Sequence, residues 1–534
     1  MNQCLAIALS ACMMALCFFS MNQASAQLNT ADILGTVSDS EGAVVPNVKV
    51  TAQNIATNDT KTVMTSSTGD YVFNLMIPGQ YTITAEAPSF KKSTVNLTVS
   101  AGDRARADIQ LQVGDLDQVV EVVAQSPALQ TDSATLSTVL AAQAVQDLPL
   151  NGRNFVTLVQ STVGVAAGPS NSILSGTRPD ERRQTANITA NGQNEVFNNQ
   201  LIDGLDNNER EQFTLLMRPS IDMIQEVKVD TNSYPAEVGR AGGAVINLLT
   251  KSGTNEFHGG LYEFLRNDKL NANDFFSNKT GVPRPKFRQN QFGGSLGGPL
   301  QKDKTFFFGD IEALRIRQGV PTGLIFTPTL YEEQHPGDFS DVGGPVIPSS
   351  QLDPVALKYW KLFPAPNAGT PGQLGANYNA NVNKIYNSTT ADVRIDHRLS
   401  DKDSIFGRFS YNPTFNSQPA LFPDVTVDGV KVSAGGGIFP GPSKADSQGY
   451  MADYVHIFGP NLIMDLKGAY TRLYLYTSAP NQGTNASQKF GMPNTDVSDQ
   501  ISGLATIDIV PMRAVGSSFT LGDDRFVPIL RSPS

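Results

Sequence analysis

The stretch 290-NQFGGSLGGPLQKDKTFFFGDIEALRIR-317 contains two runs rich in glycine and aromatic residues on either side of the short turn QKDK. In the second run Phe307 and Ile311 alternate with Asp310 and Glu312. Alternation with period two is typical of a β-strand, because successive side chains point to opposite faces. The stretch therefore predicts a β-hairpin with one apolar face and one face that carries carboxylates.

Two more hairpins of this kind follow, with tight turns at 400–403 and 459–461. Between the hairpins lie long stretches rich in Pro, Gly and Asn: 318–388, 412–447 and 475 onward. Short turns that alternate with long connections are typical of outer-membrane barrels, whereas a globular domain rarely needs such long irregular loops. Residues 253–534 are therefore expected to form the first strands of a transmembrane antiparallel β-barrel with long outer loops. In that barrel Phe307, Ile311 and Ala313 should face lipid. The expected lumen-facing residues are Asp310, Glu312, Asp392, Arg394, Asp396 and Arg398.

Composition limits the function classes. The chain has 534 residues, enough for two or more domains, and 17% of them are charged. The formal net charge is −10, which argues against a nucleic-acid partner, because phosphate backbones bind basic surfaces. Few charges and many Gly, Thr, Asn and Tyr fit a β-rich protein outside the cytoplasm.

Residues 1–26 read as a signal peptide. The apolar run Cys4–Phe19 precedes the cleavage pattern Ala24-Ser25-Ala26, although no Lys or Arg precedes the run. The alternative is a lipoprotein box at Leu9-Ser10-Ala11-Cys12. All three cysteines lie in this segment, so cleavage at Ala26 leaves a chain without thiols and excludes disulfides and cysteine-ligated metals.

Residues 27–113 contain short alternating strands between turn signals, which predict a small β-sandwich. The segments "GTVSDSEGAVVPNVKVTAQN" and "TSSTGDYVFNLMIPGQYTITAEAPSFKK" resemble the carboxypeptidase regulatory-like domain, a transthyretin-like and carbohydrate-binding-like fold. The resemblance implies no peptidase activity, because that module holds no zinc. Sugar binding follows only by fold analogy, so a structural spacer is the expected role.

Residues 114–125 form a linker with an acidic lead and a β-branched run, "DLDQVVEVVA". One interpretation is simply another strand. The other is that the run resembles a TonB box, an extended peptide that a periplasmic energy-coupling protein captures by strand addition. The candidate residues are Asp117, Val119, Val120, Glu121, Val122 and Val123.

Residues 126–252 mix helix and strand signals and predict an α+β domain. "LSTVLAAQAVQDLPL" favours a helix, and strands are expected at 225–229 and 244–250. The oxygen-rich run 203–209 lacks the spacing of a calcium-binding EF-hand loop and reads as a turn. Tight turns are expected at Gly152, Arg153, Asp203, Gly204, Gly239, Arg240, Gly242 and Gly243.

The motifs "LPLNGRNF", "LIDGLDNN", "PAEVGRAGGAVINLLTKSGTN" and "FHGGLYEFLRND", together with the first hairpin, strongly resemble the Oar-like TonB-dependent outer-membrane receptors. The resemblance runs from Ile33 to the end. It implies that 126–252 is a plug inside the barrel and that the protein lies in the outer membrane. The implied partners are a TonB-type energy-coupling protein, outer-membrane lipid, the barrel-assembly machinery and an external ligand, with a glycan or a peptide as the expected class.

No catalytic, metal or cofactor site is predicted. None of the four histidines, His258, His335, His397 and His456, begins a zinc-binding spacing, and "GGSLGG" lies on a strand rather than opening a helix. Two alternatives remain open: a surface adhesin or carbohydrate-binding outer-membrane protein without active transport, and an enzyme assisted by its regulatory-like domain.

Length sets one further expectation. About seven strands are expected after residue 255, whereas barrels that hold a plug have about 22. The sequence ends with "FVPILRSPS" rather than an aromatic strand. It is therefore expected to be the N-terminal part of a receptor.

Overall fold

The computed structural model describes residues 29–507, except 115–118, 124–134, 148–149, 151–152, 169–187, 210–214, 235–237, 274, 281–282, 371–374, 436–439, 460–461 and 499–501. The predicted signal peptide with Ala24 and Ala26 lies outside the described residues, as do Asp117 and Gly152. The described part is mainly β, which confirms the predicted fold class.

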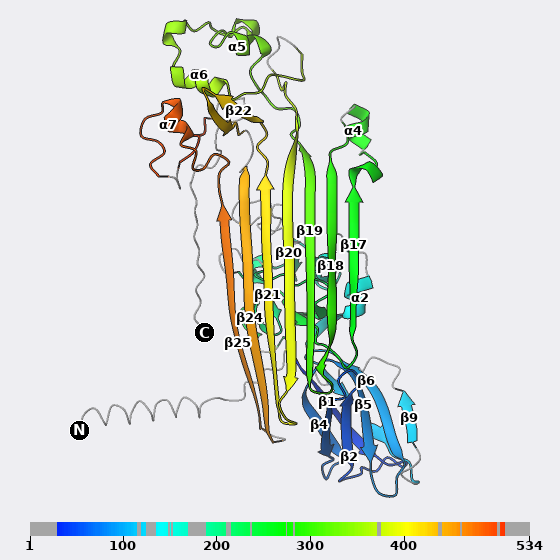
Figure 1. Cartoon of the computed structure of the whole chain (residues 1–534). Helices are drawn as coiled ribbons and strands as arrows, with labels where there is room; N and C mark the ends of the chain where they lie inside the picture. Colours follow the sequence, from blue (N-terminus) through cyan, green and yellow to red (C-terminus); the bar gives the residue numbers. More distant parts are fainter. Residues whose placement is uncertain are drawn as a thin grey trace, which may run out of the picture.

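Residues 29–114 and the strand at 119–123 form two packed sheets, here called the N-terminal sandwich (Figure 1). One sheet has the order β4-β1-β7 with β8 also on β1, and the other has the order β3-β2-β5-β6-β9. Alternate residues of the strands fill a core that includes Ile33, Val50, Phe73 and Ile83. The strands are β1 (Ala31–Ser38), β2 (Lys49–Asn54), β3 (Thr60–Met64), β4 (Asp70–Met76), β5 (Gly79–Glu86), β6 (Lys92–Val99), β7 (Arg104–Arg106), β8 (Ile109–Gln110) and β9 (Val119–Val123).

Residues 135–252 form an α+β unit, here called the inner domain, around a sheet of order β10-β15-β16-β13-β14. Its core contains Val145, Phe155, Val227 and Leu248. The elements are β10 (Leu136–Ala141), α2 (Ala142–Asp147), α3 (Val156–Val159), β11 (Val165–Ala167), β12 (Ile188–Ala190), η3 (Glu195–Phe197), β13 (Asn199–Ile202), β14 (Leu205–Asp206), β15 (Ile224–Asn232) and β16 (Val245–Thr250).

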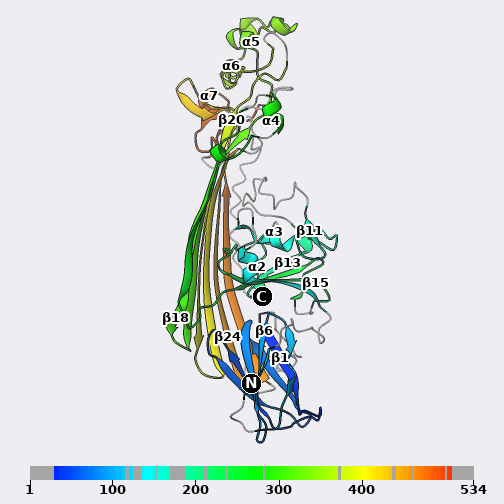
Figure 2. The same ribbon diagram turned by 90° about the vertical axis from the view of Figure 1, so that its right-hand side faces the viewer.

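The remaining strands form one antiparallel sheet of order β17-β18-β19-β20-β21-β24-β25, here called the wall. Figure 2 shows the inner domain against one face of the wall and the N-terminal sandwich near one end of it. In the described part of the chain β17 and β25 are the two edges of the wall. Its strands are β17 (His258–Asn267), β18 (Phe287–Gln301), β19 (Thr305–Pro321), β20 (Asn381–Arg398), β21 (Asp403–Gln418), β24 (Gly441–Gly459) and β25 (Leu462–Thr477).

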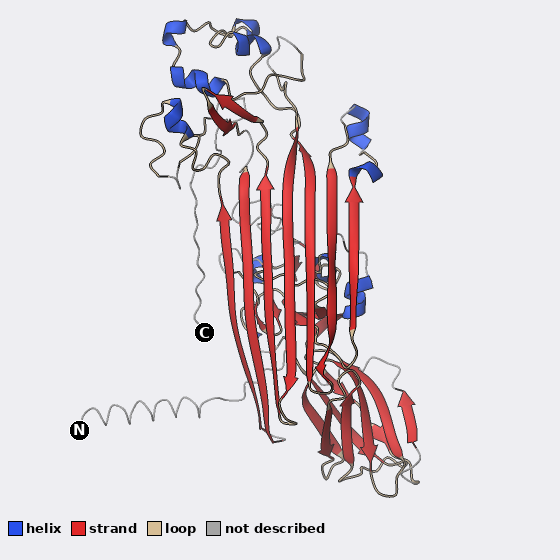
Figure 3. Ribbon diagram, in the orientation of Figure 1, coloured by secondary structure: helices blue, strands red, loops and turns tan. Residues whose placement is uncertain are grey.

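The long connections gather at the end of the wall opposite the N-terminal sandwich, where Figure 3 shows most of the helices. These connections, here called the loop cap, pack around a hydrophobic core of their own. That core includes Tyr359, Phe363, Phe422 and Phe490. The connection between β17 and β18 contains η5 (Asp268–Leu270) and α4 (Phe275–Thr280). The later connections contain α5 (Leu330–Gln334), η6 (Ser340–Val342), η7 (Ser349–Gln351), α6 (Pro354–Trp360), β22 (Asp424–Val427), β23 (Val430–Ser433) and α7 (Ala486–Phe490). Nowhere in the described ranges is a helix both long and apolar enough to cross a bilayer.

Two expectations about the elements were wrong in extent. The helix expected from "LSTVLAAQAVQDLPL" covers only α2, because β10 takes the preceding residues and pairs antiparallel with β15. The connections are also shorter than expected, since β19 continues to Pro321 and β20 starts at Asn381. Hydrogen bonding to a neighbouring strand extends each strand past the residues that alternate clearly.

Candidate functional site

The face of the wall that contacts the inner domain carries charged side chains, and the opposite face is mainly apolar. Residues of the apolar face are substantially exposed, including Ile311 at 54% and Leu466 at 63%. Others on this outward face are Phe292, Leu296, Val393, Ile395, Phe409, Tyr450, Leu462, Met464 and Tyr470. The rings of Phe409, Tyr450 and Tyr470 form a row across three strands, with centroids 5.0 and 6.4 Å apart. Such a band is what a lipid-facing surface requires.

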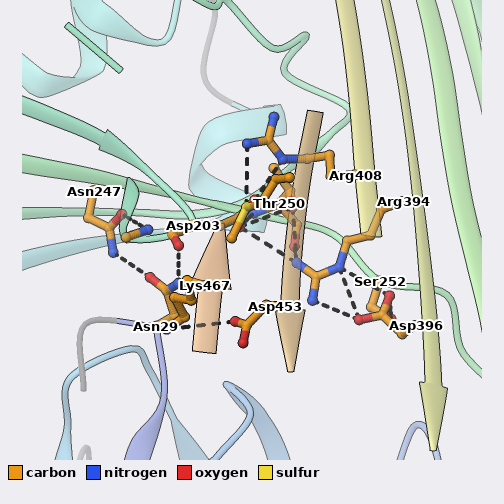
Figure 4. Close-up of polar contacts among 12 residues, drawn as sticks. Asn29, Asp203, Asn247, Thr250, Ser252, Arg394, Asp396, Arg408, Asp453 and Lys467 are labelled. Carbon is orange, nitrogen blue, oxygen red and sulfur yellow. Dashed lines mark hydrogen bonds and ion pairs between the residues drawn. The ribbon is translucent and has the colours of Figure 1, made fainter. Parts of the chain in front are cut away.

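Asp203 lies at the centre of the contact between the inner domain and the wall (Figure 4). It shares with Gly204 a two-residue turn between β13 and β14, and both residues have positive φ, 49° and 76°. An Asp-Gly pair suits this turn, because both positions need left-handed backbone. The buried carboxylate accepts hydrogen bonds from Thr250 N at 2.9 Å and from Thr250 Oγ1 at 2.9 and 3.0 Å.

Two arginines of the wall meet this carboxylate. Arg408 Nε lies 2.9 Å from Asp203 Oδ2, as an ion pair whose N–H is not aligned for a hydrogen bond. Arg394 Nη1 lies 3.6 Å from Asp203 Oδ1 and donates to Thr250 O at 3.1 Å. Arg394 is also held by Asp396, at 2.7 Å from Nη2, and its guanidinium carbon lies 3.9 Å from the centre of the Phe406 ring. The inner domain therefore docks through buried charges in fixed geometry.

Arg153 makes a second contact of this kind, in which the inner domain supplies the arginine and the wall supplies the carboxylate. Its Nη2 lies 2.7 Å from Asp222 of the inner domain, and its Nε lies 3.1 Å from Glu312 of the wall. Tyr262 donates to the same Glu312 carboxylate at 2.7 Å, and its ring centre lies 4.2 Å from the arginine. All three ionic side chains are no more than 17% exposed.

A third contact joins Ser220 of the inner domain to the carboxylate of Asp310, to which it donates a hydrogen bond. Asp392 stands directly opposite Asp310 on the neighbouring strand and is fully buried. Apolar contact is smaller and joins Leu216 and Met217 to wall residues Ala445 and Leu473. Polar contacts dominate this interface.

The structure places the six expected lumen residues as follows. Asp310, Glu312, Asp392, Arg394 and Asp396 lie on the side of the inner domain. Arg398 lies at the end of β20, where it pairs with Asp59 of the N-terminal sandwich. Sequence reasoning missed Arg408, Ser220 and Thr250 as site residues. Arg408 was identifiable because it alternates with the apolar residues of its strand, whereas no local sequence pattern identifies the others as site residues.

The predicted turns near Gly239 serve the inner domain itself. Gly242 N and Gly243 N both donate to Phe197 O, at 2.9 and 3.0 Å. A Cβ atom at Gly243 would lie 2.4 Å from Asn198 Oδ1, whereas a Cβ at Gly239 would meet open space. Arg240 has positive φ and pairs with Asp206 at 3.2 Å. The Asn198 side chain, which accepts a hydrogen bond from Ala244 N at 2.9 Å, therefore favours glycine at 243, and no such contact favours glycine at 239.

The candidate TonB-box residues Val119–Val123 form β9, which pairs in parallel with β6 at the edge of the N-terminal sandwich. The sandwich also contacts the inner domain, since Ala101 N donates to Glu226 Oε1 at 2.6 Å. Burial raises the pKa of Glu226, and the Ala101 hydrogen bond opposes that rise. Among the residues that the structure describes, no three His, Cys, Asp or Glu side chains lie close enough together to hold a metal ion.

Comparison with known proteins gives two family matches and several relatives. Residues 32–112 match the carboxypeptidase regulatory-like domain, and residues 249–532 match the outer membrane beta barrel domain. The chain is 29% identical over 290 residues to the TonB-dependent transporter Oar of Myxococcus xanthus, which covers 52% of this chain and 26% of that protein. The chain thus spans about a quarter of the length of this curated relative.

Similar solved structures include the outer membrane transporter YddB from Escherichia coli, with 14% identity, a TM-score of 0.41 and coverage of 64% of this chain and 40% of that chain. The siderophore receptor PirA from Acinetobacter baumannii has 15% identity and a TM-score of 0.33, with coverage of 64% and 45%. The barrel match covers more than half of the chain, so the protein belongs to the outer membrane beta barrel domain family, is a homologue of the transporter Oar and carries an N-terminal carboxypeptidase regulatory-like domain.

Proposed function

We propose that the protein is a TonB-dependent receptor, in which the inner domain is the plug of the barrel and moves when the coupling protein pulls on it. The observation that carries the proposal is the buried ionic docking of Asp203 between Arg394 and Arg408. Buried ion pairs fix geometry while adding little net stability, because the desolvation cost offsets much of the attraction. An interface of this kind suits a plug that must be both positioned and released.

In this proposal the domains keep the expected boundaries: sandwich 27–113, linker 114–125, plug 126–252 and barrel from 253. The linker carries the TonB box, whose residues 119–123 are extended and paired with β6. An extended segment at a sheet edge has the conformation that strand addition needs. Capture by the coupling protein would then exchange one strand partner for another.

The proposed ligand is a glycan or a peptide that binds from the outer side. The loop cap supports this assignment, because its aromatic side chains and its core give the outer loops a defined shape. The proposal includes no catalytic step, and the names of the relatives are those of transporters and receptors.

Site-specific cross-linking tests the coupling. All cysteines of the sequence lie at or before Cys17, so a single new cysteine in the exported chain is unambiguous. Val122→Cys should cross-link in cells to a cysteine in the strand-forming region of the TonB-type protein. The matched control is Thr62→Cys, on the exposed β3 at the other edge of the same sheet, which should not cross-link.

Equal cross-linking at both positions, or none at either, would contradict the coupling proposal. Surface binding that persists unchanged without the TonB-type protein would instead support the alternative, an adhesin without active transport.

A further inference from the structure

The outward face of the wall changes from apolar to basic toward its loop-cap end. On β19 the outward side chains are Phe307, Ile311 and Ala313, followed by Arg315 and Arg317. On β18 the outward Leu296 and Phe292 are followed, in the same direction, by Arg288. Long connections mark the outer side of a barrel, so this change falls where the outer leaflet meets water.

The three arginines, here called the arginine cluster, are placed against one another. Arg288 stands directly opposite Arg317 in the β18–β19 ladder, and Arg315 lies two residues away on the same face. Like charges directly opposite in a sheet are destabilising. A bound anion would offset this repulsion.

No carboxylate among the described residues lies within ion-pair distance of the cluster. Arg315 Nη2 donates to Thr389 Oγ1 at 2.9 Å, and Arg317 Nη1 donates to Asn387 Oδ1 at 2.8 Å, so both meet only neutral acceptors. Asp268, beyond the end of β17, is bound instead by Phe287 N at 3.0 Å and acts on Arg288 only at longer range. The described part of the chain therefore supplies no counter-charge at contact distance.

The other outward arginine of the wall has an acidic residue in the same pocket, although the two do not form an ion pair. Arg472 on β25 shares one small pocket with Asp446, Gln448 and Tyr474. That pocket contains its own carboxylate, so it does not call for an external anion.

We propose that the arginine cluster binds the phosphate groups of an anionic lipid headgroup in the outer leaflet. Guanidinium groups match phosphate oxygens in a bidentate geometry. The apolar Phe292 and Ile311 on the same face provide the adjacent surface for acyl chains. A ligand with phosphates and acyl chains fits both parts, whereas free phosphate would use only the first. This inference rests on the placement of the wall in the membrane and is independent of transport.

Native mass spectrometry of the intact, detergent-purified protein with added lipid A tests the proposal. The variant is Arg315→Gln with Arg317→Gln. Each basic residue near a membrane surface contributes about fivefold in binding, so the pair should weaken lipid A retention roughly 25-fold. The matched control, Lys302→Gln with Lys304→Gln, removes two charges from the opposite end of the same hairpin and should retain lipid A as the wild type does.

A thermal shift separates lost binding from lost folding. Lipid A should raise the melting temperature of the wild type and of the control, but not that of the arginine variant. The arginine variant should melt no lower than the wild type in neutral detergent without lipid, because repulsion is removed. The proposal is overturned if lipid A retention falls equally in both variants, if it falls in neither, or if inorganic phosphate alone produces the same thermal shift.

Discussion

Asp203 is the residue at which a single substitution should loosen the inner domain. Asp203→Asn keeps an acceptor for Thr250 but leaves Arg394 and Arg408 facing each other without the charge between them. Breaking a buried pair in this way costs about 3–5 kcal/mol. We expect a lower melting temperature of the purified protein. If the inner domain is the proposed plug, we also expect large antibiotics to enter cells that carry the variant.

The control for this substitution lies in the same hairpin. Asp206 is 39% exposed and pairs with Arg240, which is 46% exposed. Solvent screens such a pair, so Asp206→Asn should cost less than about 1 kcal/mol and leave antibiotic exclusion intact. Equal losses in both variants would show that the turn, and not the buried charge, holds the inner domain.

Ile311 and Glu312 are neighbours in sequence on opposite faces of β19. Ile311→Arg places a charge in the apolar band and should cost about 2–4 kcal/mol, with little folded protein recovered in the outer membrane. Glu312→Gln should insert normally, because Arg153 keeps its pairing with Asp222. Membrane fractionation with surface labelling measures both, and equal recovery would refute the assignment of faces.

At the scale of elements, the β13–β14 hairpin depends on its two-residue turn. Gly204 has φ of +76°, and a Cβ atom there would lie 2.8 Å from Asn29 Oδ1. Gly204→Ala should therefore destabilise the protein by roughly 1–3 kcal/mol, measured by thermal or denaturant unfolding. Gly239→Ala is the control, since its Cβ would meet open space, and a comparable loss there would contradict the steric argument.

Element boundaries show where local sequence is insufficient. The turns at 301–304 and 400–403 were predictable, because polar residues interrupt an alternating pattern there. Leu136–Ala141 has residues that suit a helix, yet it forms β10 because β15 offers a strand edge with free hydrogen-bonding groups. Strand propensity depends on such neighbours, which no local window contains.

At the scale of the whole molecule, Glu226 links the inner domain to the N-terminal sandwich and should make their docking depend on pH. Burial raises its folded pKa above the ordinary 4.5, so the folded state holds the proton more tightly than the unfolded state. The free energy of unfolding should therefore fall as pH rises from about 4.5 through the folded pKa, and should then level off. Unfolding measured across this range should show the decline.

Glu226→Gln is neutral at every pH and should remove that decline while raising stability at neutral pH. The control is Glu41→Gln, on an exposed loop of the N-terminal sandwich. This variant should show the same dependence of unfolding free energy on pH as the wild type. A decline that persists in Glu226→Gln would assign the pH dependence to another group.

The sequence by itself determined the β-rich class, the hairpins and the two faces of each wall strand, because side chains alternate along a strand whatever its partners are. It also predicted that charged residues share one face of these strands. Only the tertiary structure decided that Arg394 and Arg408 meet Asp203, that Arg153 meets Glu312, and that Arg398 meets the sandwich instead of the inner domain. These pairs join residues far apart in the chain, and the packing of whole domains brings them together.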